Sequence, residues 1–335
     1  MSSQVKTLFV IVLLGLAVAG GYFIGKSMHS SAENETAVNS CPVVMADIIE
    51  SSKGSVYGPD DSEAVEDTEY AEPETHYLVK YAVNGDELTN PAFEAIPFNL
   101  KDEQVDITLQ EESWEIFSTL IPIEDRQMVT QYNIFTDGYS NTLAAVDQTP
   151  DDLTQWIVEI DVADLDDKNS FIFTLVHEYA HLLTLDSTQA SVDEEIYNDP
   201  TNLELLESKA ADCPNYFTGA GCSYEDSYIN AFYNRFWVEI NDEWQAIDKL
   251  QYEDDITLYY EGLYNFYLTH QDQFVDDYAT THPAEDIAES FTYFVFSPKP
   301  TGNSIIDQKI LFFYEYPELV ELRQYILDGT CSTIQ

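Results

Sequence analysis

Apolar residues are distributed unevenly along the chain, and their distribution predicts its organisation. Residues 8–24 form an unbroken apolar run, whereas residues 27–75 are rich in Ser, Glu, Asp and Ala. From residue 76 onward, apolar side chains recur with the periods of strands and helices. The pattern therefore predicts an N-terminal targeting segment over 1–26, an acidic disordered tether over 27–75 and a folded domain over 76–335.

Alternating apolar and polar positions predict four strands in the first half of the folded domain. These strands cover residues 77–83, 128–135, 142–146 and 156–161. Between the first two strands, residues 98–120 contain a predicted helix. Its apolar stripe consists of Leu109, Trp114, Ile116, Phe117 and Leu120.

The second half of the domain has the pattern of helices rich in aromatic residues. Residues 171–185 are apolar on nearly all faces, which is typical of a buried helix. Aromatic stripes over 227–239 and 257–268 predict two further helices, and such stripes usually belong to a core. We therefore expect an α+β fold in which a small mixed sheet is followed by a mainly helical C-terminal subdomain.

The charge of the chain limits its partners. Its 335 residues include 62 acidic and 13 basic side chains, which gives a formal net charge of −49 and a pI of about 4.1. Such a surface repels nucleic acid and anionic membranes, so we expect neither as a partner. A second hypothesis is adaptation to salty surroundings, where screening relieves the self-repulsion.

Two interpretations of the apolar run 8–24 stay open. Its 17 residues are short for a membrane span and long for the core of a signal peptide. Ala17-Val18-Ala19 offers a cleavage site, while Gly21-x-x-x-Gly25 suits a packed membrane helix. Both interpretations predict export, so we expect the domain to be secreted or tethered to the outer face of the membrane.

The four cysteines are spaced unlike a zinc-cysteine site, because the chain has no Cys-x-x-Cys pair. Export and an even number of cysteines favour two disulfides. We expect Cys213 to pair with Cys222 across a short loop, and Cys41 to pair with Cys331. Four free thiols are the alternative.

The apolar stretch 171–185 carries the most informative motif, His177-Glu178-x-x-His181. On a helix, residues four apart lie on one face, so both imidazoles can point at the same metal ion. Glu178 is turned about 100° from His177, where it can reach a water on the metal. Two neutral nitrogen ligands beside a carboxylate suit a zinc hydrolase. The alternative is a pair of hydrogen-bonded core histidines.

A catalytic zinc ion needs a third protein ligand, for which the sequence offers two nearby candidates. The metzincin pattern requires Gly at position 184 and His at position 187, and Thr184 and Ser187 exclude it. Glu204 or Glu207 would serve as a closely spaced third ligand.

A more distant segment, 277–291, is the candidate that we prefer. His282-Pro283 predicts a helix start, after which Glu285 and Glu289 stand one turn apart on one face. Paired carboxylates on the core side of a helix are costly unless a cation lies beside them. Glu285 would then bind zinc, and Glu289 would hold the free ring nitrogen of a ligand histidine. An exposed acidic helix start is the alternative.

A run of acidic residues precedes the motif and raises a separate question. Asp161, Asp164, Asp166 and Asp167 could ligate calcium, but their spacing does not fit an EF-hand loop. We therefore favour a solvated acidic loop.

Taken together, His177-Glu178-x-x-His181 and Tyr278-x6-Glu285-x3-Glu289 resemble the gluzincin metallopeptidases, a zincin-like fold. The pattern is similar to the anthrax lethal factor and Pro-Pro endopeptidase type, and to uncharacterised secreted bacterial zinc-metallopeptidase-like proteins. The resemblance implies Zn²⁺ on His177, His181 and Glu285, with Glu178 as general base and Tyr278 as a transition-state stabiliser. The chain departs from those relatives in the spacing from His181 to Glu285, which at 104 positions is longer than theirs.

These observations predict an exported zinc endopeptidase that acts on a peptide or protein substrate as a monomer. His282 competes with Tyr278 as the donor that stabilises the transition state, because it lies three residues before Glu285. Two other functions stay open. One is a non-enzymatic surface protein with a degenerate or structural zinc site, and the other is a zinc amidase that acts on cell-wall peptide.

Overall fold

The structure, a computed structural model of the chain, describes residues 41–51, 75–138, 142–253 and 256–334, and the side chains of these residues from 45 onward. The predicted targeting segment and most of the predicted tether lie outside these residues. Among the described residues, no helix has the length and apolar character needed to cross a membrane.

Five strands form one mixed sheet in the order β2-β1-β3-β5-β4. Strands β3 and β5 pair in parallel, and the other neighbours pair antiparallel. The strand bounds are β1 His76–Asn84, β2 Glu87–Phe93, β3 Val129–Thr136, β4 Ala144–Thr149 and β5 Asp152–Asp161. With the helices that follow, this sheet confirms the predicted α+β class.

The pattern of the sequence predicted four of these strands and missed β2. Strand β2 is an exposed edge strand that contains Pro91, and proline is tolerated at an edge because its missing N–H would face solvent. Strands β1 and β2 are joined by a tight turn at which Gly85 has a φ of 65°, a conformation that favours glycine.

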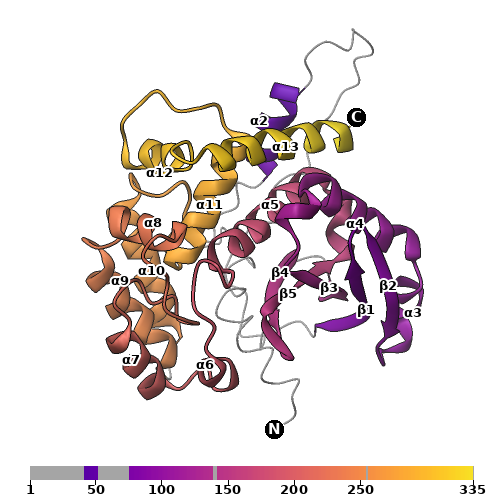
Figure 1. The fold of residues 1–335 in the computed structure, drawn as a ribbon, viewed down its shortest axis with the longest axis horizontal. Helices are drawn as coiled ribbons and strands as arrows, with labels where there is room; N and C mark the ends of the chain where they lie inside the picture. Colours follow the sequence, from indigo (N-terminus) through magenta and orange to yellow (C-terminus); the bar gives the residue numbers. More distant parts are fainter. Residues whose placement is uncertain (1–40, 52–74, 139–141, 254–255, 335) are drawn as a thin grey trace, which may run out of the picture.

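Two helices pack on the sheet, α4 (Ile107–Leu120) and α5 (Lys168–Leu185) (Figure 1). Each helix has an aspartate as its N-cap residue. The Asp106 side chain accepts a hydrogen bond from Thr108 N in α4, and the Asp167 side chain accepts from Asn169 N and Ser170 N in α5. In α4, all of the predicted stripe is buried except Leu109, which is partly buried.

The acidic loop before α5 is partly a capping structure rather than a solvated loop. Asp161 is fully buried, and its side chain starts the short helix η3 (Val162–Asp166) by accepting from Ala163 N. Its other oxygen accepts from Asp137 N at 2.8 Å. No aspartate of this loop belongs to a group of described residues that could hold a metal ion.

The chain after α5 is helical, as predicted, and forms the second half of the molecule beside the sheet (Figure 1). The longer helices are α7 Leu203–Asp212, α8 Tyr228–Phe236, α9 Asn241–Asp248, α10 Thr257–His270, α11 Pro283–Phe296, α12 Ile305–Phe313 and α13 Pro317–Ile334. The short elements are η1 Phe98–Leu100, α3 Lys101–Gln104, η2 Ile123–Asp125, α6 Glu194–Asn198, η4 Lys249–Tyr252 and η5 Tyr278–Thr280.

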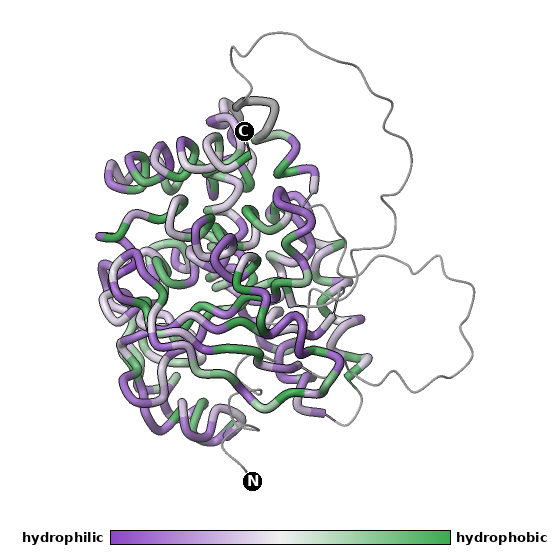
Figure 2. Tube along the Cα trace, turned by 90° about the vertical axis from the view of Figure 1, so that its right-hand side faces the viewer, coloured by the Kyte–Doolittle hydropathy of each residue, from purple (hydrophilic) through white to green (hydrophobic). Residues whose placement is uncertain are grey.

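Aromatic side chains of these helices pack on one another in the core. Trp237 stacks on Phe266 and meets Phe274 edge-on, with ring centroids 6.3 and 5.5 Å apart. In Figure 2, hydrophobic and hydrophilic residues are interleaved along the helices, as expected for helices that bury one face. The interpretation of the aromatic stripes as core therefore agrees with the packing.

One helix lies within the stretch predicted to be a disordered tether. Helix α2 (Cys41–Ser51) lies beside α5, α11 and α13, and its Ile48 is fully buried (Figure 1). The expectation of disorder over 27–75 is therefore wrong for this part. The reason is local: the acidic character of the stretch as a whole conceals a short apolar sequence, Val43-Val44-Met45-Ala46-Asp47-Ile48-Ile49.

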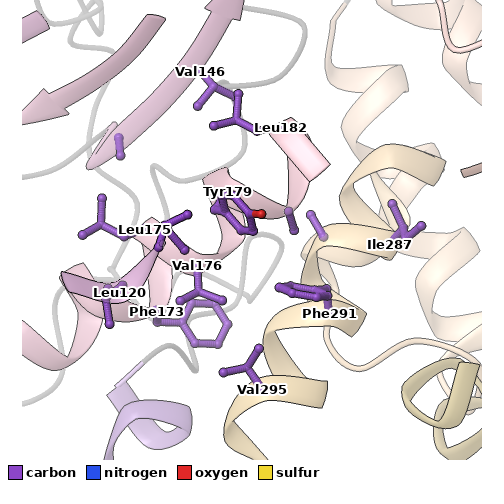
Figure 3. Packing of buried hydrophobic residues seen from close by; sticks show 14 of the residues in the cluster. Leu120, Val146, Phe173, Leu175, Val176, Tyr179, Leu182, Ile287, Phe291 and Val295 are labelled. Carbon is purple, nitrogen blue, oxygen red and sulfur yellow. The ribbon is translucent and has the colours of Figure 1, made fainter. Parts of the chain in front are cut away.

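Helix α5 lies at the centre of the hydrophobic core. Its Leu175, Val176 and Leu182 are fully buried; Leu182 lies near Val146 of β4, and the helix faces α11 (Figure 3). A helix that is largely enclosed by a sheet and by other helices has little solvent-exposed surface, which explains its apolar sequence.

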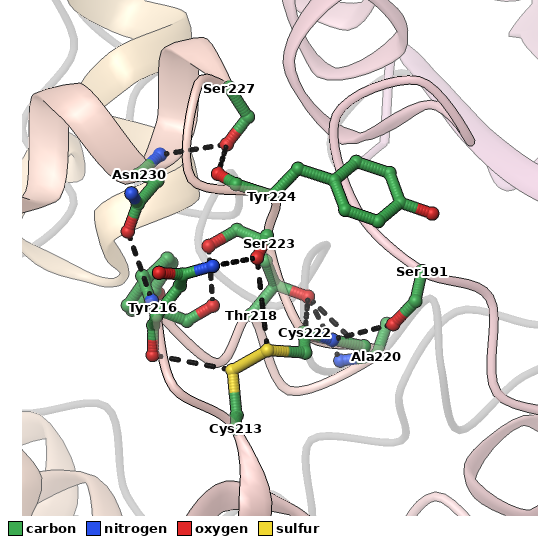
Figure 4. Close-up of a disulfide and its surroundings, with 12 residues drawn as sticks. Ser191, Cys213, Tyr216, Thr218, Ala220, Cys222, Ser223, Tyr224, Ser227 and Asn230 are labelled. Carbon is green, nitrogen blue, oxygen red and sulfur yellow. Dashed lines mark hydrogen bonds between the residues drawn. A yellow bond between two sulfur atoms is a disulfide. The ribbon is translucent and has the colours of Figure 1, made fainter.

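The predicted disulfide between Cys213 and Cys222 is confirmed (Figure 4). Its loop is attached to the segment after α5, because Ser191 N donates to Cys222 O and Cys222 N donates to Ser191 Oγ. Cys331 is also disulfide-bonded, but the side chain of Cys41 lies outside the described side chains, so its pairing stays a prediction.

Candidate metal centre

Helix α5 supplies two imidazoles from one of its faces. His177 and His181 are one turn apart, and only 5% and 3% of their surfaces are exposed. Their Nε2 atoms lie 3.1 Å apart. Because imidazoles are rarely buried in apolar surroundings without polar partners, their environment decides what they do.

Helix α11 supplies two carboxylates to the same place. It begins as predicted, with His282 as the N-cap and Pro283 in the first turn. Glu285 and Glu289 follow one turn apart, and their exposed fractions are 2% and 4%. The alternative of an exposed acidic helix start is therefore wrong. Packing of α11 against α5 brings these carboxylates to the histidines.

Three ligand atoms converge at this contact. Glu285 Oε2 lies 3.1 Å from His177 Nε2 and 3.3 Å from His181 Nε2. Ligands about 2.0–2.1 Å from a tetrahedral zinc ion are themselves separated by roughly 3.3 Å. The three atoms therefore fit zinc with little movement. Among the described residues, His177, His181 and Glu285 form the one group of this kind that could hold a metal ion.

Glu289 lies behind His177 rather than beside the metal position. Its Oε1 is 2.8 Å from His177 Nδ1. A carboxylate at this nitrogen favours a proton on Nδ1 and leaves Nε2 with a free lone pair, which is the form that binds a metal. Glu289 therefore lies at the distance from His177 that its predicted supporting role requires.

The carboxylates and imidazoles of the cluster shift one another's pKa values, each favouring the charged form of the other. Burial alone would lower the pKa of His177, but Glu289 and Glu285 raise it well above its usual value. Burial alone would raise the pKa of Glu285, but His181 and His177 lower it far below its usual range. Glu285 Oε1 is buried and accepts no hydrogen bond from the described residues, which leaves it able to accept a cation.

Glu178 lies next to the cluster and is mostly buried, with a small exposed part. Burial raises its pKa to about 7, although His181 and His177 oppose the shift. A carboxyl group with a pKa near neutrality can both accept and return a proton at physiological pH. This is the property that a general base in a hydrolase needs.

Tyr278 and His282 both lie at the cluster. The Tyr278 ring is 5.7 Å from the His177 ring, and its hydroxyl is a hydrogen-bond donor. His282 Nδ1 accepts from Ala284 N at 3.0 Å, so the neutral ring carries its proton on Nε2. Burial lowers the pKa of His282 to about 4, which keeps the ring neutral. Both residues can therefore donate a hydrogen bond.

The nearby alternatives for a third ligand are not part of the cluster. Glu204 and Glu207 lie on α7 and are exposed to solvent. Glu207 instead pairs with Lys249 at 3.3 Å on the surface. Of the three carboxylates considered, the structure brings only Glu285 to the histidines.

Two further groups adjoin the cluster and were missed in the sequence. Asp276 accepts from Ala279 N at 2.9 Å and hydrogen-bonds Glu289, and burial together with Glu289 raises its pKa well above the usual value. Asp286 is fully buried and pairs with Lys309. A lysine within the apolar sequence Ile305-Ile-Asp-Gln-Lys-Ile-Leu-Phe-Phe313 was a signal that could have revealed the second group.

Comparison with known proteins adds no relative, because no family model, no curated protein and no solved structure matches the chain. The site must therefore be interpreted from its own chemistry.

Proposed function

We propose that the protein is a zinc-dependent endopeptidase. The observation that carries the proposal is the convergence of His177, His181 and Glu285 into one buried set of ligands, with Glu178 beside it. A purely structural metal site has no use for a further carboxyl group beside its ligands. This carboxyl group favours a hydrolase over a structural or degenerate zinc site.

Each residue of the site has a separate role in the proposed hydrolysis. When bound, zinc supplies Lewis-acid activation of a water molecule and of the substrate carbonyl. Glu178 takes a proton from the attacking water and passes it to the leaving nitrogen. The Tyr278 hydroxyl donates to the negative charge that develops on the substrate oxygen, and His282 Nε2 is a second donor.

The position of β4 supports a peptide as the substrate. It is an outer strand of the sheet and packs against α5, and no described strand pairs with its outer side. An extended peptide can add to such an edge through main-chain hydrogen bonds. Because main-chain recognition does not require a chain terminus, this arrangement favours internal cleavage.

The decisive experiment is digestion of a mixed peptide library by the purified protein, with zinc content measured in parallel. We expect internal cleavage, one zinc per chain, and loss of both with a chelator. Cleavage of cell-wall peptide alone would favour the amidase, and tight zinc without any cleavage would favour the non-enzymatic protein.

Replacement of Glu178 by Gln tests the role of the base. The amide keeps the size of the side chain but cannot take up the proton, so we expect peptide cleavage to fall by at least about a hundredfold while one zinc per chain is retained. Glu194→Gln, at an exposed position of α6, is the matched control and should cleave normally. Normal cleavage by the Glu178 variant would contradict the assignment.

Replacement of Glu285 by Ala tests the third ligand. We expect zinc affinity to fall by more than a hundredfold, because two histidines alone hold zinc weakly. Glu204→Ala, which removes the exposed alternative, should bind zinc like the wild-type protein. Metal analysis after dialysis distinguishes the two variants, and full zinc retention by Glu285→Ala would refute the proposed ligand set.

A further inference from the structure

The first turn of α11 contains a second buried carboxylate, whose partners are not those of Glu285. Asp286 Oδ2 forms an ion pair with Lys309 Nζ of α12 at 2.6 Å and accepts a hydrogen bond from Trp237 Nε1, at the end of α8, at 2.7 Å. The side chains of Asp286 and Lys309 are both 0% exposed. One carboxylate therefore joins three helices immediately behind the metal centre.

Lys309 is fully buried, which is unusual for a charged side chain. Its Nζ lies 3.9 Å from the centre of the Phe274 ring, and the four residues that follow it in α12 are all apolar. Among the described residues, no other lysine is buried. Burial lowers the pKa of Lys309, whereas Asp286 and Asp276 raise it. The lysine thus lies between aromatic rings and the carboxylates of Asp286 and Asp276.

Folding stability alone is a poor explanation for such a pair. Removing two charges from water is costly, and well-packed apolar side chains of similar size often stabilise a fold as well or better. A buried pair that requires particular partners can instead specify one geometry.

The geometry that this pair specifies is the rotation of α11. Successive residues of a helix are turned by about 100° from one another. Fixing Asp286 toward α12 and Trp237 therefore also fixes the directions of Glu285 and Glu289, which face the histidines of α5. A small rotation of α11 would break both contacts at once.

We propose that the Asp286–Lys309 pair, together with Trp237, positions α11 so that Glu285 and Glu289 meet the histidines at the geometry a metal requires. Metal affinity then depends on a lysine that does not touch the metal. This inference rests on the proposed metal centre, but it does not require that the centre hydrolyse peptides.

The test uses the full chain and measures two quantities, the zinc dissociation constant by competition with a chromophoric chelator and the melting temperature of the zinc-free protein. Lys309→Met leaves Asp286 buried and unpaired, so both quantities should worsen. The double variant Asp286→Leu with Lys309→Met should regain the melting temperature within a few degrees. Its zinc affinity should stay about tenfold or more below that of the wild-type protein.

A gentler variant keeps the test decisive if the others do not fold. Trp237→Phe removes one hydrogen bond to Asp286 while keeping an aromatic ring, and should weaken zinc binding severalfold. Arg235→Gln is the control, because Arg235 forms an exposed pair with Glu315 at 2.7 Å and should leave zinc affinity unchanged.

Wild-type zinc affinity in the double variant, or in Trp237→Phe, would show that the pair serves folding alone and would overturn the proposal. A wild-type protein that binds no zinc would overturn this proposal and the proposed metal centre together. Zinc binding without peptide cleavage would instead refute only the proposed hydrolase, because every measurement here is of metal affinity or stability.

Discussion

Tyr278 is held as a neutral hydrogen-bond donor. Burial is the main cause that raises the pKa of its phenol well above the usual value, and Glu285, Glu178 and Glu289 raise it further. A hydroxyl that keeps its proton at every physiological pH is suited to stabilise negative charge on a reacting oxygen. This property depends on the whole cluster, so spacing in the sequence indicated the residue but not its protonation state.

Replacement of Tyr278 by Phe separates donation from metal binding. Loss of one donor to a transition state typically lowers kcat by roughly a hundredfold or more, so we expect such a fall with KM and zinc content nearly unchanged. Steady-state kinetics and metal analysis provide the measurement. Tyr325→Phe, at an exposed tyrosine, should behave as the wild-type protein. Unchanged kcat in Tyr278→Phe would assign the role of donor to His282.

Helices and strands with a strong periodic pattern of apolar residues could be predicted from the sequence. Features that depend on contacts with distant parts of the chain could not. The periods in the sequence predicted β1, β3, β4, β5, α4, α5, α8, α10 and the start of α11. Strand β2 was missed because it is exposed and contains a proline. Similarly, spacing indicated the residues of the cluster, whereas the pairing of Asp286 with Lys309 arises only when α12 packs on α11. The sequence therefore predicts a helix or strand from its periodic apolar residues, but it does not show which other helix or strand packs against it.

Gly329 shows how such a neighbour can reverse a local preference. It lies in α13, and a Cβ atom there would be 2.6 Å from the Thr119 carbonyl oxygen of α4. Helix propensity alone predicts that Gly→Ala stabilises a helix by about 1 kcal/mol. We expect Gly329→Ala to destabilise the protein by about 1–3 kcal/mol, because the two helices must move apart.

Urea unfolding of Gly329→Ala measures this effect. Glu321→Ala, at an exposed position of the same helix, is the control and should change the free energy of unfolding by less than about 0.5 kcal/mol. A Gly329→Ala variant more stable than the wild-type protein would mean that α13 does not approach α4 this closely.

For the whole molecule, buried carboxyl groups predict greater stability in mild acid. Burial raises the pKa of Asp147 to about 7, of Asp161 to about 8 and of Asp164 to about 7, from an ordinary value of 3.8. Nearby carboxylates add to each shift: Glu159 at Asp147, Asp164 and then Asp137 at Asp161, and Asp137 at Asp164. None of these groups lies at the metal centre.

The sign of the pH dependence follows from these pKa values. Between about pH 4 and pH 8 the folded chain holds protons that the unfolded chain releases. Stability from this source is full near pH 4 and is lost as the pH rises toward 8. We therefore expect the free energy of unfolding to be at least about 1 kcal/mol larger at pH 5 than at pH 8.

Urea unfolding at several pH values measures this trend, and high salt isolates its cause. The net charge of −49 gives a trend of the same sign through self-repulsion, but salt screens that repulsion far more than it affects buried groups. The pH trend should therefore persist at 1 M salt and become shallower in Asp147→Asn. Maximal stability at pH 8 in high salt would contradict the prediction.

The separation of the ligands along the chain has a consequence for the order in which the protein matures. Glu285 lies 104 positions after His181, so it is synthesised after the helices α6 to α10 that lie between them in the chain. A chain still being synthesised presents the two histidines before the third proposed ligand. In the proposed metal centre, binding of the metal is therefore a late step that requires α11 to be in place, and an unfinished chain lacks the complete set of proposed ligands.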